Sequence, residues 1–258
     1  MRGVILAAGR GSRLGGLTEE RPKCLVPLAG RPLLAWQRAA LTAGGIAELA
    51  VVAGYRSEML NDRGLTVIPA PRWAQTNMVR SLLAAEHWVA TTPCVVSYAD
   101  IVYTAETVRR LISAPGGLAI AYDPAWAQLW HRRFADPRVD AETFRLAPDG
   151  ALEQIGARPA TVAEVQGQYM GLLRFTPSAW TGVRAVLDTM PPAEVDALDM
   201  TSLLQRLLKA GHRIETVPCQ GAWGEVDSTT DLAVCEDLVA QGRLVFHQER
   251  ETHTWSSG

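Results

Sequence analysis

A glycine-rich segment with three basic side chains lies near the start of the sequence. The apolar run Val4–Ala8 is typical of a strand buried on both faces, and it leads directly into Gly9-Arg10-Gly11-Ser12-Arg13. Glycines after a buried strand let backbone N–H groups approach a ligand closely, as phosphate groups require. Arg10, Arg13 and Lys23 add positive charge. The pattern predicts a phosphate-binding loop, although a Gly-x-Gly pair alone would equally suit an ordinary strand-to-helix turn.

An aspartate follows the apolar segment with the clearest strand character in the middle of the chain. Cys94–Tyr98 predicts a central strand, and Asp100 stands just beyond its carboxyl end. Ligands of open α/β sheets bind outside those ends, and Mg²⁺ prefers carboxylate oxygens. A single aspartate at this place would also suit a helix cap or a loop. Together with the glycine loop, Asp100 is a predicted metal ligand.

The first segment also contains a longer motif, Leu6-Ala-Ala-Gly-x-Gly-Ser-Arg-Leu14 followed by Pro22-Lys-x-Leu-Val-Pro-Leu28. This string resembles the N-terminal signature of the nucleotidyltransferase superfamily, whose members transfer NMP from an NTP to a phosphorylated acceptor. The resemblance implies that Gly9–Ser12 wrap the NTP phosphates, that Arg13 contacts the β- and γ-phosphates, and that Lys23 lies near the α-phosphate. A serine before the arginine, where sugar-phosphate members usually have threonine, makes the string more similar to cytidylyltransferases acting on phosphocholine and on phosphonates.

Two later stretches extend the resemblance. Trp223-Gly-Glu-Val-Asp227 resembles a late family motif, which implies that Asp227 is the second Mg²⁺ ligand beside Asp100. Asn77 and Ser81 match positions at which small phosphocholine-type members hold the base or ribose, although Asn77 would also suit a plain helix cap. The predicted catalytic residues are Arg13, Lys23, Asp100 and Asp227. The predicted nucleotide-binding residues are Leu6, Ala7, Ala8, Gly9, Arg10, Gly11, Ser12, Arg13, Lys23, Asn77, Ser81 and Asp100.

The segment 123–142 breaks the periodic pattern and combines aromatic with basic side chains. An irregular stretch of this length inside a domain is usually functional or disordered, and aromatics beside arginines suit a lid over a charged acceptor. A dimer contact or a small satellite core would account for it equally well. The family resemblance adds a later segment that lines the acceptor pocket. The predicted acceptor-binding residues are Trp126, Trp130, Glu164, Tyr169, Met170 and Trp223.

The elements that must position these residues alternate between strand and helix. Strands are expected at 48–53, 66–68, 94–98 and 118–122, with helices at 33–43, 78–89 and 105–113 between them. This rhythm predicts an α/β fold with a Rossmann-like, mixed but mostly parallel sheet flanked by helices. Residues 1–258 are expected to form a single domain, with a lid and acceptor-binding insertion at about 123–170.

Composition excludes several classes of partner. The chain has 258 residues and a formal net charge of −2, with no basic stripe, so nucleic acid is not an expected partner. Its four cysteines are scattered without Cys-x-x-Cys spacing, which predicts reduced thiols rather than disulfides or a zinc site. No leader and no apolar run of membrane length is visible, so we expect a cytoplasmic protein, which could form a homodimer.

The expected activity is Mg²⁺-dependent transfer of CMP from CTP to a small phosphorylated or phosphonate acceptor, with release of pyrophosphate. The segment 123–142 contains one glutamine and no asparagine, which favours a non-sugar acceptor bearing an amine or carboxylate. The alternatives are a sugar-1-phosphate nucleotidyltransferase using dTTP, UTP or GTP, and a non-catalytic nucleotide-binding regulatory subunit.

Overall fold

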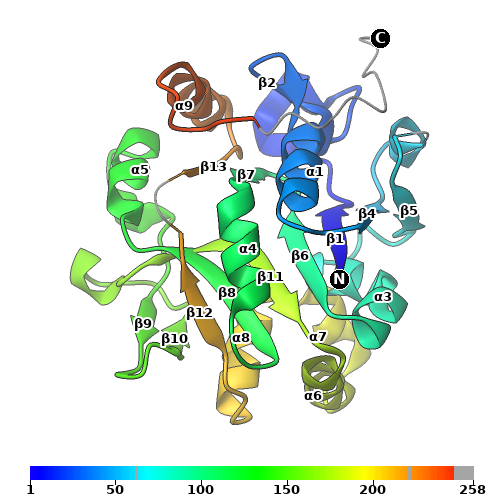
Figure 1. The fold of residues 1–258 in the computed structure, drawn as a ribbon, viewed down its shortest axis with the longest axis vertical. Helices are drawn as coiled ribbons and strands as arrows, with labels where there is room; N and C mark the ends of the chain where they lie inside the picture. Colours follow the sequence, from blue (N-terminus) through cyan, green and yellow to red (C-terminus); the bar gives the residue numbers. More distant parts are fainter. Residues whose placement is uncertain (62, 220–221, 247–258) are drawn as a thin grey trace.

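One seven-stranded sheet forms the centre of the computed structural model, which describes residues 1–246 except 62, 220 and 221. Its strand order is β12-β8-β11-β6-β1-β4-β5 (Figure 1). Only β11 runs antiparallel to its neighbours among these strands. The fold is therefore the predicted Rossmann-like, mostly parallel sheet. The strands are β1 (Arg2–Ala7), β4 (Glu48–Ala53), β5 (Thr66–Pro69), β6 (Cys94–Tyr98), β8 (Leu118–Asp123), β11 (Gln168–Phe175) and β12 (Glu215–Pro218).

Helices cover both faces of this sheet. In Figure 1, α4 lies in front of the sheet, next to α1, while α8 lies behind it. The central strands have both faces buried, and Val4, Ile5, Val95 and Val96 have no exposed surface, because helices pack on either side. The helices are α1 (Leu33–Ala43), α2 (Met78–Ala84), α3 (Glu86–Thr91), α4 (Ala105–Ser113), α5 (Trp126–Arg133), α6 (Pro177–Asp188), α7 (Pro192–Ala197), α8 (Met200–Lys209) and α9 (Thr229–Ala240).

Three two-stranded ribbons lie outside the main sheet. They are β2 (Pro27–Leu28) with β3 (Arg31–Pro32), β9 (Phe144–Leu146) with β10 (Leu152–Ile155), and β7 (Ile101–Tyr103) with β13 (Trp223–Glu225). The last ribbon is antiparallel and joins the chain just after β6 to the chain just before α9. It therefore brings together two segments that are distant in sequence.

Two predictions of local structure were wrong. The single helix expected at 78–89 is broken at Ala85, whose backbone angles are non-helical, so that α2 and α3 are separate. The segment 123–142 is not irregular, because it contains helix α5. The buried face of α5 is formed by Trp126, Leu129, Trp130 and Arg133, spaced as a helix requires, but the terminal arginine hides this apolar period.

The C-terminal segment after Gly242 is described only as far as Phe246, and residues 247–258 lie outside the described part. Within the described residues, no helix combines the length and the hydropathy that a membrane span needs.

Candidate active site

The glycine loop packs directly on the side chain of Lys23. Gly11 has a φ of 74°, in the left-handed region that favours glycine. A Cβ atom there would lie 2.7 Å from the Lys23 Cβ, so any larger residue would collide with the lysine stem. The Thr18 hydroxyl is 3.1 Å from the Gly11 carbonyl oxygen and 3.2 Å from that of Gly15, and donates to this pair of acceptors. The loop is thus held from within its own segment.

Lys23 connects the loop to two carboxylates. Its Nζ atom donates to Asp100 Oδ2 at 2.8 Å and also to Asp227 Oδ1. Burial alone would lower the lysine pKa, but the two aspartates outweigh it and raise the pKa above its ordinary value. Arg13 Nη2 lies 3.0 Å from Asp227 Oδ2, with most of the arginine side chain exposed. The structure therefore brings together all four residues for which catalytic roles are predicted.

The ribbon of β7 and β13 explains how two distant aspartates meet. Glu225 pairs with Ile101 across the ribbon, and the Val226 N–H donates to the Asp100 carbonyl oxygen at 2.8 Å. Asp100 immediately precedes β7, and Asp227 follows β13 by two residues. Because antiparallel pairing aligns these two ends, both side chains reach the same place beside Lys23.

The start of α9 fixes the backbone at Asp227. Asp231 Oδ2 accepts the N–H groups of Asp227 and Ser228 at 3.1 and 2.9 Å, and Ser228 Oγ accepts the Asp231 N–H at 3.2 Å. This reciprocal arrangement is a capping box. It satisfies the Asp231 N–H in the first turn of α9 and fixes the backbone N–H groups of Asp227 and Ser228 just before the helix.

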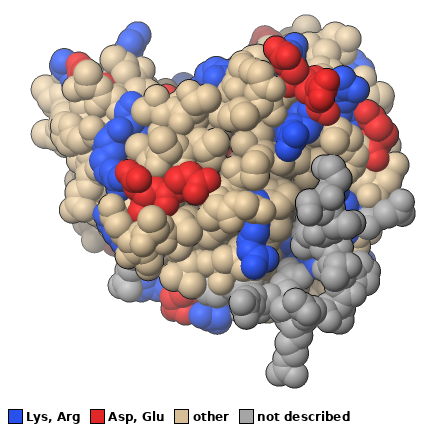
Figure 2. Space-filling model, turned by 90° about the horizontal axis from the view of Figure 1, so that it is seen from above, with Lys and Arg blue, Asp and Glu red and all other residues tan. Residues whose placement is uncertain are grey.

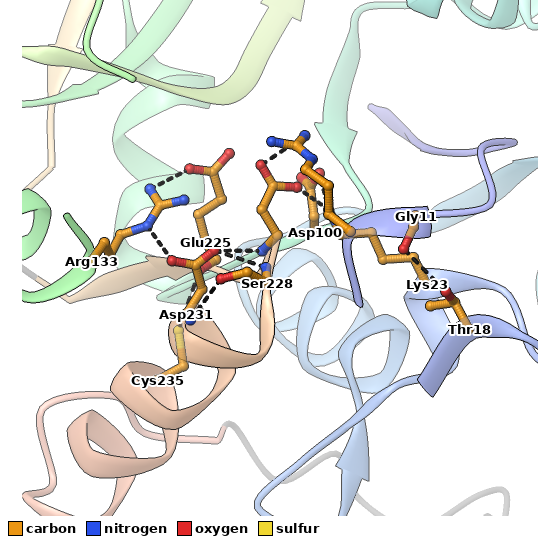
Figure 3. A network of polar contacts seen from close by, with 11 residues as sticks. Gly11, Thr18, Lys23, Asp100, Arg133, Glu225, Ser228, Asp231 and Cys235 are labelled. Carbon is orange, nitrogen blue, oxygen red and sulfur yellow. Dashed lines mark hydrogen bonds and ion pairs between the residues drawn. The ribbon is translucent and has the colours of Figure 1, made fainter. Parts of the chain in front are cut away.

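Two further charged residues, Glu225 and Arg133, belong to the site but were not predicted from the sequence. Arg133 Nη1 donates to Glu225 Oε2 at 2.6 Å, and its Nε donates to Asp231 Oδ1 at 2.7 Å (Figure 3). Burial raises the pKa of Glu225 to about 8, with Arg133 opposing and the nearby aspartates adding to the rise. The sequence did carry a signal for Glu225. It lies two residues before Asp227, and residues two apart on an extended chain point to the same face.

The acidic side chains at this point fit a divalent cation. Carboxylate oxygens of Asp100, Glu225 and Asp227 lie within 4.8 Å of one another. Asp100 Oδ1 is buried and has no hydrogen-bond partner within the described part of the chain. Oxygen ligands of this kind suit Mg²⁺. With Asp231, these carboxylates contact the three cations Arg13, Lys23 and Arg133.

Comparisons with known proteins identify the family. The model of the MobA-like NTP transferase domain matches residues 3–163. The chain belongs to this family. CTP:phosphoglutamine cytidylyltransferase of Campylobacter jejuni is 34% identical over 251 residues, which cover 91% of this chain and 98% of that protein. The protein is thus a nucleotidyltransferase with cytidylyltransferases among its relatives, as the N-terminal motif predicted.

Two solved structures share the fold of this nucleotidyltransferase. The inositol-1-phosphate CTP transferase from T. maritima has a TM-score of 0.73 at 18% identity, covering 92% of this chain and 95% of that one. CTP:phosphocholine cytidylyltransferase from Streptococcus pneumoniae has a TM-score of 0.69 at 18% identity, covering 92% and 98%. Both matches extend well beyond residue 163, into the half of the chain that holds Asp227.

The predicted base-binding residues of the nucleotidyltransferase lie around the start of α2. Asn77 caps this helix: its Oδ1 accepts the Met78 N–H at 2.8 Å, and its Nδ2 donates to the Ala197 carbonyl oxygen at 3.1 Å. The amide is thus engaged within the protein, as the capping interpretation expects. Ser81 lines a cavity of about 310 Å³ together with Trp73 and Thr76. A nucleotide-binding role for Asn77 and Ser81 stays a prediction.

The three tryptophans that were predicted to bind the acceptor are buried in the protein interior. Trp126, Trp130 and Trp223 are at most 3% exposed and pack on one another, with Trp126 and Trp130 at 6.1 Å and Trp130 and Trp223 at 5.9 Å between ring centroids. The indole N–H of Trp126 donates to the Val165 carbonyl oxygen, and that of Trp223 to Asp123. Burying three large rings in one cluster is favourable, and it leaves them no surface for an acceptor. All three belong to the hydrophobic core of the protein.

The other predicted acceptor residues are also engaged elsewhere. Met170 is 1% exposed. The Glu164 carboxylate accepts the Ala160 N–H and the Thr161 hydroxyl within a local turn, both at 3.2 Å. Tyr169 is nine-tenths buried and meets the Tyr98 ring edge to face.

Two partly buried carboxylates, Asp140 and Glu142, lie on the stretch after α5. Asp140 lies within electrostatic range of Arg133, Asp227 and Arg13, and burial raises its pKa. Burial also raises the pKa of Glu142, although a hydrogen bond from Thr201 opposes the rise. Figure 2 views the molecule from the side of the carboxyl strand ends, where acidic side chains adjoin basic ones in two groups on a largely uncharged face.

Proposed function

We propose that this nucleotidyltransferase transfers CMP from CTP to a small phosphorylated or phosphonate acceptor that carries an amine, releasing pyrophosphate, with Mg²⁺ as its cofactor. The observation that carries this proposal is the cluster of Lys23, Asp100 and Asp227 at the carboxyl ends of the sheet. The relative from C. jejuni, named for CTP and phosphoglutamine, supports the nucleotide and the acceptor class.

The residues would divide the work as follows. The glycine loop and Arg13 bind the β- and γ-phosphates of CTP, because backbone N–H groups and a guanidinium suit phosphate oxygens. Lys23 stabilises the negative charge that grows at the α-phosphate during transfer. Asp100 and Asp227, with Glu225, hold the Mg²⁺ ion, which neutralises charge between the two reacting phosphates when bound.

The reaction needs no nucleophile from the protein. An oxygen of the acceptor attacks the α-phosphorus, a new P–O bond forms, and the bond to the pyrophosphate leaving group breaks. Phosphate and phosphonate oxygens are already ionised at neutral pH, so a general base is dispensable. Catalysis then consists of alignment and charge stabilisation.

The acceptor's ammonium group would bind between Asp140 and Glu142. Both carboxylates lie on the chain after α5, and Asp140 is within electrostatic range of Asp227 and Arg13. Half-buried carboxylates bind a cation more strongly than exposed ones, because water screens them less. The four buried cysteine thiols suit a reducing compartment, so we place the activity in the cytoplasm.

The proposal is tested by measuring pyrophosphate release with each of CTP, UTP, GTP and dTTP. The acceptor panel contains glutamine phosphate, phosphocholine, 2-aminoethylphosphonate, inositol 1-phosphate and glucose 1-phosphate. We expect turnover with CTP and an amine-bearing acceptor, and no turnover in Asp227→Asn. Turnover with glucose 1-phosphate and UTP or dTTP alone would refute the proposal in favour of the sugar-phosphate alternative.

A pair of variants tests the acceptor site. Asp140→Asn should raise the KM for the acceptor and leave the KM for CTP unchanged. Glu164→Gln is the matched control, because this carboxylate only closes a local turn. Equal acceptor KM values in wild type and Asp140→Asn would remove Asp140 from the acceptor site.

A further inference from the structure

Arg133 makes an unusual set of contacts for a residue on the acceptor side of the molecule. It is the last residue of α5, yet its side chain is only 1% exposed. Its guanidinium bonds two different carboxylates, Glu225 at 2.6 Å and Asp231 at 2.7 Å. One of these acids belongs to the predicted metal site, and the other caps α9 beneath it. Figure 3 shows the arginine between them.

Packing prevents this guanidinium from moving away. It stacks on the ring of Trp130, with the guanidinium carbon 4.5 Å from the ring centroid, and lies 5.0 Å from the centroid of Phe134. Burial would disfavour its charge, but Glu225 and Asp231 keep its pKa above the ordinary value, so the group remains a cation. The rings of Trp130 and Phe134 thus hold the positively charged guanidinium of Arg133 in place.

The contacts of Asp231 lead from this charge to the metal site. Its Oδ1 accepts from Arg133, while its Oδ2 accepts the backbone N–H groups of Asp227 and Ser228. The arginine therefore fixes the carboxylate that fixes the backbone of Asp227. Through Glu225 Oε2 it also orients a second acid, leaving the other oxygen of that carboxylate for the site. Groups that orient metal ligands in this way usually control affinity.

We propose that Arg133 is a positioning residue: it holds Glu225 and Asp227 in the arrangement that binds the cation, and it thereby couples helix α5 on the acceptor side to the metal site. The inference rests on the proposed function for the identity of the site. It assigns the buried aromatic cluster a purpose beyond packing, since the rings keep the guanidinium in place.

The test compares Arg133→Met and Arg133→Lys with wild type in the full-length protein. Mn²⁺ binding in the presence of CTP is measured by titration and electron paramagnetic resonance, without acceptor. Loss of an orienting group typically costs about 10- to 100-fold in metal affinity or activity, and we expect Arg133→Met to weaken Mn²⁺ binding on that scale. Arg133→Lys, which can reach one carboxylate but not hold both, should lie between Arg133→Met and wild type.

Arg132→Met is the matched control. This neighbouring residue on α5 pairs at 3.1 Å with Asp237, which is exposed and outside the site. It should bind Mn²⁺ like wild type. Unchanged Mn²⁺ affinity in Arg133→Met, with only a lower melting temperature, would overturn the proposal, because packing alone predicts that result. Tighter Mn²⁺ binding would also overturn it, because it would show the arginine to be a competing charge. Should Arg133→Met fail to fold, Arg133→Lys carries the same comparison.

The direct binding measurement separates this inference from the proposed function. A wild-type protein that binds Mn²⁺ but transfers no CMP would refute the function alone. A wild-type enzyme that transfers CMP, together with Arg133 variants of normal Mn²⁺ affinity, would refute the inference alone.

Discussion

The contact between Gly11 and Lys23 makes the lysine position sensitive to one methyl group. A Cβ at residue 11 would come 2.7 Å from the Lys23 Cβ and would also be strained by the positive φ. We expect Gly11→Ala to push Lys23 away from Asp100 and to lower kcat on the order of 10²-fold, as a displacement of about 1 Å in a catalytic group can do. Steady-state pyrophosphate release checks this.

Gly16→Ala is the control for that substitution. It lies in the same loop, but a Cβ there would meet no atom within 4 Å. The two variants should therefore differ in kcat, although each adds one methyl group. Similar kcat values for both would show that the position of Lys23 does not depend on Gly11.

Glu225 should make the free energy of unfolding of the metal-free protein depend on pH. Its pKa is raised from 4.5 to about 8, so the folded state holds a proton that the unfolded chain releases. The free energy of unfolding should therefore fall as pH rises from about 4.5 to about 8. Glu225→Gln cannot titrate, so its unfolding free energy should fall less over this window. Denaturant unfolding in EDTA across the window measures the difference.

The exposed Glu153 on the β9–β10 hairpin provides the comparison. Glu153→Gln should retain the wild-type slope of unfolding free energy against pH. If Glu225→Gln retained that slope as well, the carboxyl of residue 225 would have no raised pKa in the folded protein.

At the scale of residues, contiguous motifs were informative and scattered contacts were not. Arg13 and Lys23 lie in one recognisable string, and Asp100 follows a strongly apolar strand, so the sequence indicated all three. Arg133 is one of several basic residues in the segment 123–142, and nothing in the sequence distinguishes it from the others. Its role depends on Glu225 and Asp231, which lie 92 and 98 residues further along, and no local pattern encodes contacts over that distance.

The β7–β13 ribbon depends on the absence of a side chain at Gly224. A Cβ there would lie 2.5 Å from Cys235 Sγ on α9. We expect Gly224→Ala to destabilise the fold by about 1–3 kcal/mol, as overpacking usually does, and to lower kcat by shifting β13 and hence Asp227. Thermal unfolding and pyrophosphate release measure the two effects.

Removal of the opposing atom tests the cause. The double variant Gly224→Ala/Cys235→Ala should recover part of the lost stability relative to the sum of the single variants, because the methyl group added at position 224 can then occupy the space left by the sulfur atom of Cys235. Strictly additive losses would indicate that the ribbon does not pack on α9 at this point.

At the scale of elements, strong periodicity decided what the sequence could predict. The segments 33–43 and 105–113 are helices with the expected bounds, since each has a clear cap or a regular apolar face. Ribbon β7–β13 could not be foreseen, because its strands have three residues each and pair across the length of the chain. Helix α5 was missed because its buried stripe ends in an arginine.

At the scale of the whole molecule, binding of CTP should raise the free energy of unfolding, which can be measured. A ligand that binds only the folded state stabilises it by about 2.7 kcal/mol at one hundred times its Kd. We expect CTP with Mg²⁺ to raise the melting temperature more than CTP with EDTA does. In Asp100→Asn the increment due to Mg²⁺ should disappear, because a buried ligand oxygen is lost.

Asp188→Asn serves as the reference, since this residue lies at the end of α6 and pairs with Arg184 there. It should show the wild-type increment with Mg²⁺. An Asp100→Asn protein that keeps the full increment would show that the cation binds elsewhere.

The long separation between Lys23 and Asp227, 204 residues, has a consequence for the order of events during synthesis. The glycine loop and Asp100 leave the ribosome early. The strands β4 and β6, which pair with β1, are made in the same part of the chain. The second aspartate emerges only when the segment leading into α9 has been made, and β13 must then find β7. In the proposed function, the loop that binds nucleotide phosphates is therefore made long before the second metal ligand, and the site is complete only after β13 has paired with β7.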